Sequence, residues 1–508
     1  MGGIILQKFL EKSDSRKIEV INFLEESYLQ QASISTISKN LKISEFILVR
    51  TVNELIEDIE KYQLSHYFTL SKTDKVILLK KSGAASINLL LWIYLKQSLS
   101  FELLDEIFKG TFENINYYSE KNFVSYTKIY KRLMEIKKIL NEHDIRLSSK
   151  FKLAGDEMNI RMFFYQFYVP VFNQIEFPFA DELKAVSQEL ITNLEKIEQK
   201  SFSEATKTKL SFFIGVMFNR IGTDCYLFNA SKIKDKELPR EQYHEAIYLT
   251  IIDFVKTYTG IEQQNFLIAE ANFIFAFLIG ETIIKEQSTE KKAIKKISFQ
   301  TEKSEYQLFS NFLMEELSRY LAKDIPDDLK EQFLQQLDFI HFKVFYFERI
   351  NTEFTKNMNV EYIKENYWDA YHFSIEFLEK ISKEKGYRNI ALNKEFLFYQ
   401  YLFIIINTFP PAFFMKPIKI CVDFSLGVNY NQMILTNLQT FSYLNIEVSD
   451  TLTSETDLLI SDYYFNEKLV NCEYLVWNMP PTASDWANVG EALMRIKKSK
   501  ETEGIVNG

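Results

Sequence analysis

The sequence predicts a mainly α-helical protein of several domains that ends in a small α/β domain. Its 508 residues exceed what one hydrophobic core supports, so several domains are expected. The 14 glycines and 9 prolines are too few for the many turns of an all-β protein, and they suit long helices joined by short connections. Hydrophobic residues make up 46% of the chain, which is enough to give each domain a core.

The composition also indicates where the protein works. Its three cysteines, Cys225, Cys421 and Cys472, are far apart and form no CxxC pair, as is typical of a reducing compartment. Charged residues occur from Lys8 onward, so no signal peptide is expected. The apolar run from Phe266 to Gly280 is too short to span a bilayer and contains a glutamate. We therefore expect a cytoplasmic protein without a membrane partner.

Positive charge is concentrated in one short segment of an acidic chain. The formal net charge is -9, yet the segment from Lys121 to Lys152 holds nine lysines and arginines against three acidic residues. A local excess of this kind is typical of a surface that faces phosphates.

An amphipathic helix is predicted inside this basic segment. The apolar residues recur at spacings of four, three and four, which places them on one buried stripe: Ile129, Leu133, Ile136 and Leu140. Ser125 precedes the helix as a candidate N-cap. The side chains that project from the opposite face are Thr127, Lys128, Lys131 and Lys138, with Arg132 beside them.

The same arrangement occurs 81 positions upstream. There Ser44 precedes an apolar stripe with the same spacing, formed by Leu48, Val52, Leu55 and Ile59. A shorter helical pattern precedes each copy, and a candidate β-ribbon follows it, with turns at Lys72–Asp74 and near Ala154–Asp156. The repeat therefore predicts tandem winged helix-turn-helix domains at residues 1–85 and 86–165.

Double-stranded DNA is the partner that these helices favour. A recognition helix needs a packed inner face and polar or basic residues near its outer N-terminal end. The candidate DNA-binding residues are Ser125, Thr127, Lys128, Lys131, Arg132 and Lys138, with Arg50 from the first copy. Glu54 and Glu57 would repel phosphates, so the second copy is expected to carry more of the affinity. Two alternatives remain open here, since a basic face can simply be solvated and winged helices also bind proteins.

The end of the second copy is similar to a known family. The segment KFKLAGDEMNIRMFFYQFY, residues 150–168, resembles the end of the second winged helix in the Mga/AtxA family of virulence regulators. The preceding NFVSYTKIYKRLMEIKKIL is similar to its Mga-type helix-turn-helix. The resemblance implies a DNA-binding transcriptional regulator with two helical phosphotransferase-regulatory domains (PRDs), at residues 166–287 and 288–412. It also implies a C-terminal domain like a sugar-transport enzyme IIB, at residues 413–508, through which a homodimer would form.

PRDs of many families are phosphorylated on histidine by the sugar phosphotransferase system, so the resemblance directs attention to the histidines. His341 and His372, in the second helical module, are the candidates, because a phosphohistidine needs an exposed imidazole and nearby cations. A packed structural histidine is the alternative for His341. In the first module, Phe212 and Phe213 stand where the family's histidine before an arginine would fall, which departs from the family pattern. His244 lies beside two glutamates and is interpreted as structural.

After Pro417, apolar runs alternate with helical stretches and predict a small parallel α/β sheet. The segment KPIKICVDFSLGVNYNQMI resembles the first strand, phosphate loop and helix of an enzyme IIB-like domain. Here, however, Cys421 lies within the strand and Asp423 stands at the loop mouth, where its charge would disfavour a thiolate or a phosphate. Dimerisation or docking is therefore expected of this domain rather than phosphotransfer.

No enzyme motif of the P-loop, HExxH, GxSxG or GxGxxG type occurs in the sequence, and the five histidines have no metal-ligand spacing. Neither catalysis nor a cofactor is expected. The hypothesis is a homodimeric DNA-binding regulator that a phosphotransferase-system phosphocarrier protein regulates. The alternatives are a phosphocarrier component of that system and a PRD antiterminator that binds RNA, although such antiterminators begin with a β-rich RNA module.

Overall fold

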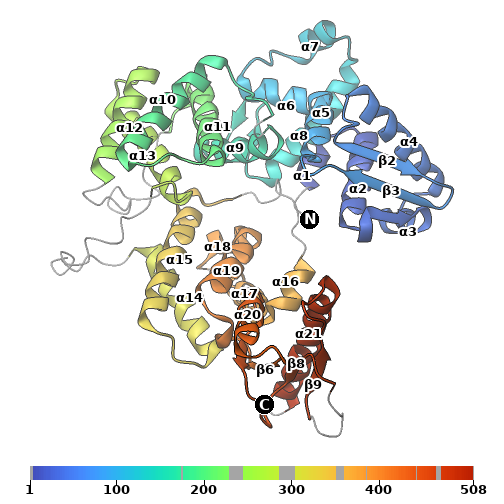
Figure 1. The fold of residues 1–508 in the computed structure, drawn as a ribbon. Coiled ribbons are helices and arrows are strands. Elements are labelled where there is room, and N and C mark those ends of the chain that lie inside the picture. Colours follow the sequence, from blue (N-terminus) through green and yellow to red (C-terminus); the bar gives the residue numbers. More distant parts are fainter. Residues whose placement is uncertain are drawn as a thin grey trace. The chain divides into compact units, whose positions relative to one another are not determined.

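The computed structural model describes residues 4–172, 175–227, 244–284, 304–350, 360–384, 386–441, 443–464 and 471–506. The chain is mainly helical and divides into two compact units (Figure 1). The first unit comprises residues 1–304, 342–358 and 388–396, and the second comprises residues 305–341, 359–387 and 397–508. Among the helices described, none combines the length and hydrophobicity that crossing a membrane requires.

The first copy of the repeat forms a helix-turn-helix followed by a β-hairpin. Its helices are α1 (Ile4–Lys8), α2 (Lys12–Glu26), α3 (Ile34–Leu41) and α4 (Glu45–Lys61), with a 3-10 turn at Tyr28–Gln30. Its antiparallel sheet has the order β1-β3-β2, from β1 (Gln31–Ser33), β2 (Phe68–Lys72) and β3 (Val76–Lys81). The predicted apolar stripe of α4 is buried throughout, and the hairpin turns after Lys72, as the sequence predicts.

The second copy repeats the helices with a much shorter hairpin. Its elements are α5 (Asn88–Lys96), α6 (Leu99–Lys109), α7 (Ile115–Asn122), α8 (Tyr126–Glu142), β4 (Arg146–Leu147) and β5 (Leu153–Ala154). The predicted stripe of α8 is buried. The predicted turn near Ala154–Asp156 is wrong. The chain turns at Ser148–Lys152 instead, where Phe151 takes a positive φ of 57° and the Ser148 amide donates to the Lys152 carbonyl.

Further helices of the first unit follow the second hairpin. They are α9 (Glu157–Phe172), α10 (Asp181–Glu198), α11 (Glu204–Ile221), α12 (His244–Thr259) and α13 (Gln264–Gly280). The apolar run that the sequence predicts to be buried forms α13, whose residues from Ala269 to Ile279 are all buried. Gly215 allows the ring of Phe179 to lie against α11, because a Cβ there would be 2.4 Å from that ring.

The second helical module is built from α14 (Glu305–Leu321), α15 (Asp327–Phe347), α16 (Val360–Asn366), α17 (Trp368–Ile381) and α19 (Lys394–Thr408). The short α18 (Arg388–Leu392) belongs to the first unit. Phenylalanine and tyrosine rings fill the interior of this module, with Phe309, Phe377 and Tyr401 among them.

The C-terminal part is a four-stranded parallel sheet with helices, as the alternating pattern predicts. The strands are β6 (Ile418–Asp423), β7 (Ile446–Ser449), β8 (Leu458–Ser461) and β9 (Glu473–Val476), in the order β7-β6-β8-β9. The helices are α20 (Val428–Leu438) and α21 (Ala483–Val506). Their core includes Ile420, Val422, Ile434, Trp477 and Leu493, all nearly inaccessible.

Candidate nucleic-acid interface

The two helix-turn-helix segments have the same hydrogen bonds at their turns. In the first, Lys42 takes a positive φ of 53°, and the Ser38 hydroxyl donates to the Ile43 carbonyl at 2.5 Å. Exactly 81 residues later, Phe123 has a φ of 55°, and the Ser119 hydroxyl donates to the Val124 carbonyl at 2.6 Å. A serine hydroxyl that closes the turn locally explains why two different sequences enter their second helices in the same way.

The N-terminal ends of the preceding helices correspond as well. The Ser33 hydroxyl accepts from the Thr36 amide at 3.0 Å at the start of α3, and the Asn114 side chain accepts from the Tyr117 amide at 2.9 Å at the start of α7. Both residues are strongly favoured N-caps because they satisfy an amide that has no partner within the helix. The repeat seen in the sequence is therefore a structural repeat.

The second helix of the second copy, α8, presents most of the predicted DNA-binding side chains to solvent. Ser125, Thr127, Lys128, Lys131 and Lys138 are all exposed. Ser125 occupies the N-cap position with an extended backbone, but its side chain caps no amide among the residues described, unlike Ser44, which accepts from the Ile47 amide at 3.3 Å. The Ser125 hydroxyl is thus part of the exposed surface rather than of the cap.

Arg132 differs from the other predicted residues because it is held by carboxylates. Its guanidinium lies 2.6 Å from Glu11 and 2.8 Å from Glu135, and its side chain is 19% exposed. Burial alone would lower the pKa of Arg132. The hydrogen bonds and charges of Glu135 and Glu11 have the larger effect, so the pKa is raised. Near the end of α8, Lys8 also pairs with Glu142 at 3.1 Å. α8 therefore contacts the N-terminal helices through Arg132 and Glu142.

The corresponding helix of the first copy, α4, has a different outer surface. Arg50 is exposed, and its guanidinium pairs with Glu54 at 2.8 Å. Beside it, Phe46 and Ile47 are exposed apolar side chains at the positions of Thr127 and Lys128 in the second copy. Arg50, the side chain of α4 that is predicted to bind DNA, is therefore already paired with a carboxylate.

Sequence reasoning missed a group of exposed aromatic side chains around the α7–α8 turn. Phe123, in the turn itself, is 96% exposed, and Tyr117, Tyr126 and Tyr130 are about half exposed. The rings of Tyr126 and Tyr130 are stacked, with centroids 6.4 Å apart and an interplanar angle of 8°. Their spacing of four at the edge of the apolar stripe was a visible signal in the sequence.

Comparison with family models matches this part of the chain to one described as the Mga helix-turn-helix domain. The match covers residues 83–168. The match includes α5 to α8, the short hairpin and most of α9. It therefore contains every predicted DNA-binding residue except Arg50.

Two curated proteins of Bacillus anthracis are similar over longer stretches. The chain is 22% identical over 307 residues to the capsule synthesis positive regulator AcpA, a match that covers 60% of this chain and 61% of AcpA. It is 23% identical over 214 residues to the capsule synthesis positive regulator AcpB, covering 42% of this chain and 43% of AcpB. The matches thus cover less than two thirds of either relative. With the Mga domain, they confirm the resemblance to Mga/AtxA-like regulators.

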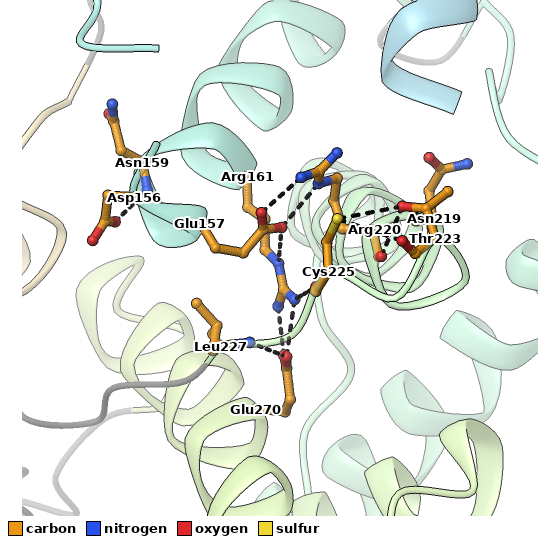
Figure 2. Close-up of polar contacts among 10 residues, drawn as sticks. All are labelled: Asp156, Glu157, Asn159, Arg161, Asn219, Arg220, Thr223, Cys225, Leu227 and Glu270. Atoms are coloured by element: carbon orange, nitrogen blue, oxygen red, sulfur yellow. Dashed lines mark hydrogen bonds and ion pairs between the residues drawn. The ribbon is translucent and has the colours of Figure 1, made fainter. Parts of the chain in front are cut away.

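The helix that ends the Mga domain, α9, is held by a buried network of charges (Figure 2). The Arg161 guanidinium donates to both oxygens of Glu270, on α13, at 2.5 and 2.9 Å, and to Glu157 at 3.0 Å. Arg220, on α11, donates to both oxygens of Glu157 at 2.9 and 2.7 Å. Three helices that are distant in the sequence therefore meet through two arginines and two glutamates.

The network also includes the main chain. Arg161 donates to the Cys225 carbonyl at 2.8 Å, and the Leu227 amide donates to Glu270 at 2.9 Å. Burial opposes the charge of Arg161, but Glu270 and Glu157 raise its pKa above the usual value. Arg220, the arginine that follows Phe212 and Phe213 in the first helical module, has Glu157 as its partner.

The two histidines predicted to accept phosphate lie in different environments. His341 is 0% exposed, and its ring nitrogens lie 2.8 Å from the hydroxyls of Ser310 and Tyr401. Burial lowers the pKa of His341 to about 3, so the ring is neutral at physiological pH. The His372 side chain is 41% exposed, stacks on Trp368 and has Nδ1 3.4 Å from Glu376. Only His372 meets the requirement for an accessible imidazole.

In the loop after β6, two backbone amides are already hydrogen-bonded to side chains of the protein. The Ser425 amide donates to Asp462 at 2.8 Å, and the Phe424 amide donates to Asn431 at 3.0 Å. Cys421 is buried within β6, and burial, with a smaller contribution from Asp423, raises the pKa of its thiol to about 11. A buried neutral thiol beside carboxylates is poorly suited to accept phosphate.

Proposed function

We propose that the chain is a DNA-binding transcriptional regulator that contacts double-stranded DNA mainly through α8. The observation that carries this proposal is the exposed basic face of a helix inside an Mga helix-turn-helix domain. Thr127, Lys128, Lys131 and Lys138 project from one side of a helix whose other side is buried. This is the arrangement by which a recognition helix enters the major groove while its lysines neutralise phosphates.

In this proposal the second copy of the repeat contributes more to the affinity for DNA than the first. Both are interpreted as winged helix-turn-helix domains, at residues 1–85 and 86–165. In α4, the one exposed arginine is paired with a glutamate. In α8, the exposed side chains of Lys128, Lys131 and Lys138 have no ion-pair partner among the residues described. Arg132 is assigned to holding α8 against Glu11, and the lysines are assigned to DNA.

The direction of regulation is taken from the two relatives. AcpA and AcpB are named as positive regulators of capsule synthesis, and we infer that this chain also activates transcription. Its target genes are those at whose promoters it binds, and a cytoplasmic location follows from that role.

The rest of the chain is proposed to regulate DNA binding. Residues 166–287 and 288–412 are interpreted as PRD-like helical domains, and residues 413–508 as an enzyme IIB-like domain that forms a homodimer. A phosphotransferase-system phosphocarrier protein would modify His372, because its imidazole is partly exposed. Phosphorylation of His341 would require the helix pair around it to open, since both ring nitrogens are hydrogen-bonded in the interior.

The alternative of a phosphocarrier component is less well supported. It needs a reactive thiolate and a loop with unoccupied amides, whereas Cys421 is buried and the Ser425 amide already binds Asp462. The alternative of an RNA-binding antiterminator needs a β-rich RNA-binding module, whereas the basic surface described here lies on the helix α8.

The experiment that tests the proposed function is a genome-wide map of DNA bound by the intact protein, followed by binding measurements on the recovered fragments. The proposal predicts a small set of enriched sites upstream of genes whose transcripts fall when the protein is deleted. Uniform recovery of DNA, with no enriched site and no change in transcripts, would reject it.

A further inference from the structure

The exposed surface of α8 has two flanks of different chemistry. On a helix with 3.6 residues per turn, Tyr126 and Tyr130 lie about 40° apart along one flank. Lys128 and Arg132 lie about 40° apart along the opposite flank. Thr127 and Lys131 lie between the two flanks. The chemistry of the flanks therefore decides which side of the helix can approach a base pair most closely.

The flank that contains Arg132 is already occupied by protein. Arg132 is held by Glu11 from the start of α2 and by Glu135 from α8 itself. The N-terminal helices therefore limit close approach of a DNA duplex on this side. Lys128, at the N-terminal end of this flank, stays exposed and can still reach a phosphate.

The flank that contains the tyrosines is open. Tyr126 is 52% exposed and Tyr130 is 48% exposed, and their stacked rings form one continuous apolar surface one helical turn long. Tyr126 is the first residue of α8, and the first turns of a recognition helix are the part that contacts base edges. The pair therefore lies at the end of the helix from which bases are read.

The tyrosine pair occurs only in the basic copy of the repeat. Glu45 and Val49 stand at the equivalent positions in α4, 81 residues upstream. Ile47 and Glu57 stand in α4 at the positions of Lys128 and Lys138, so the stacked tyrosines and these two lysines are present in one helix and absent from the other. A shared function on the same ligand accounts for both features.

We propose that Tyr126 and Tyr130 enter the major groove and pack against thymine methyl groups, so that α8 selects A·T pairs at the positions they contact. This inference rests on the proposed function, since it needs α8 to bind DNA. The thymine 5-methyl group is the one apolar feature that the major groove presents, and aromatic side chains can pack against it. The lysines contribute affinity for any sequence, and the tyrosines contribute sequence preference.

The test uses the full-length protein and a duplex selected from a random library. Each thymine of that duplex is replaced singly by deoxyuridine, which removes only the methyl group. Wild-type protein is expected to lose about fourfold in affinity at each contacted thymine, as burial of one methyl group predicts. The double variant Tyr126→Ala/Tyr130→Ala is expected to bind the thymine duplex and its deoxyuridine counterparts equally. Its salt dependence of DNA binding should be that of the wild type.

The control variant is Leu249→Ala/Tyr258→Ala, which removes two exposed apolar side chains from α12 and should keep the discrimination. Thermal unfolding of the tyrosine variant is expected to match the wild type, because both rings are half exposed. A variant that still discriminates thymine from uracil as the wild type does would overturn the inference. The inference would also be overturned if Tyr126→Ala/Tyr130→Ala altered the self-association of the protein and left its DNA binding unchanged. If wild-type protein selects no duplex at all, the proposed function itself fails.

Discussion

Arg161 and Glu270 form a bidentate ion pair in the interior of the first unit, with N–O distances of 2.5 and 2.9 Å and side chains that are 1% and 0% exposed. Arg161 lies on α9, which continues directly from the second hairpin, and Glu270 lies on α13 (Figure 2). The pair therefore joins the end of the Mga domain to the helical module that follows it. A change in the packing of α13 would reach α9 through this contact.

Removing one partner of this pair should destabilise the protein strongly. We expect Arg161→Ala to lower the free energy of unfolding by about 3–5 kcal/mol, because Glu270 would remain buried without its counter-charge. Urea unfolding followed by circular dichroism measures this change. The control is Arg319→Ala, an exposed arginine paired with Glu316 on its own helix, for which a loss below about 1 kcal/mol is expected.

A double-mutant cycle with Glu270→Gln tests whether the two residues act together. The combined variant should lose clearly less stability than the sum of the two single variants, since both remove the same interaction. Additive losses would contradict the proposed coupling between α9 and α13.

The environment of His341 predicts a dependence of stability on pH. Burial lowers the folded-state pKa of His341 to about 3, below its usual value of 6.5, so the unfolded chain binds a proton more readily than the folded protein does. Stability from this group is therefore present above pH 6.5 and is lost as the pH falls toward 3, at up to about 1.4 kcal/mol per pH unit.

Comparing wild type with His341→Gln by urea unfolding at several pH values isolates this contribution. The variant should be less stable at pH 7 and should show a flatter decline between pH 6.5 and pH 4. Parallel profiles for the two proteins would mean that His341 is not buried as a neutral ring. His372→Gln is the matched control, because it removes a partly exposed imidazole from the same helical module outside the buried cluster around His341.

Phosphate transfer is predicted to occur on His372 and not on His341. Incubation with the general phosphotransferase proteins and labelled phosphoenolpyruvate should label the wild type, and His372→Ala should remove the label. His341→Gln should keep it, since the buried ring has no access to a phosphocarrier protein. Absence of label on the wild type would reject regulation by this system, and label that persists in His372→Ala would assign it elsewhere.

Cys421 is predicted to be an unreactive thiol. Because burial raises its pKa to about 11, almost none of it is thiolate at pH 7, and reaction with a water-soluble disulfide reagent should be slow until the protein is unfolded. Cys421→Ser should leave transcription from the target promoters unchanged. A variant that lost all activity would favour the phosphocarrier alternative.

The sequence was most informative where structure is local. The spacing of apolar residues predicted α4 and α8 with their buried stripes, and the shift of 81 residues predicted that their turns correspond. Hydrophobic periodicity and turn residues act over a few positions, so one sequence reveals them. The second hairpin was placed wrongly because the left-handed backbone of Phe151 has no signature in residue type.

Contacts between distant residues could not be predicted in the same way. Arg132 was predicted to bind DNA, and its partner Glu11 lies 121 positions away; Arg161 and Glu270 are 109 positions apart. Such pairs depend on how helices pack, which periodicity does not specify. The burial of His341 likewise depends on Ser310 and Tyr401, which come from two other helices.

The most direct test of the central claim is the salt dependence of DNA binding by Lys128→Ala/Lys131→Ala/Lys138→Ala. If each lysine contacts one phosphate, the slope of log affinity against log salt should fall by about 2.7, at about 0.9 per contact. The control variant Lys184→Ala/Lys196→Ala/Lys200→Ala removes the same charge from exposed positions on and just after α10 and should keep the wild-type slope. Equal slopes for wild type and the α8 variant would contradict the assignment of α8 to DNA.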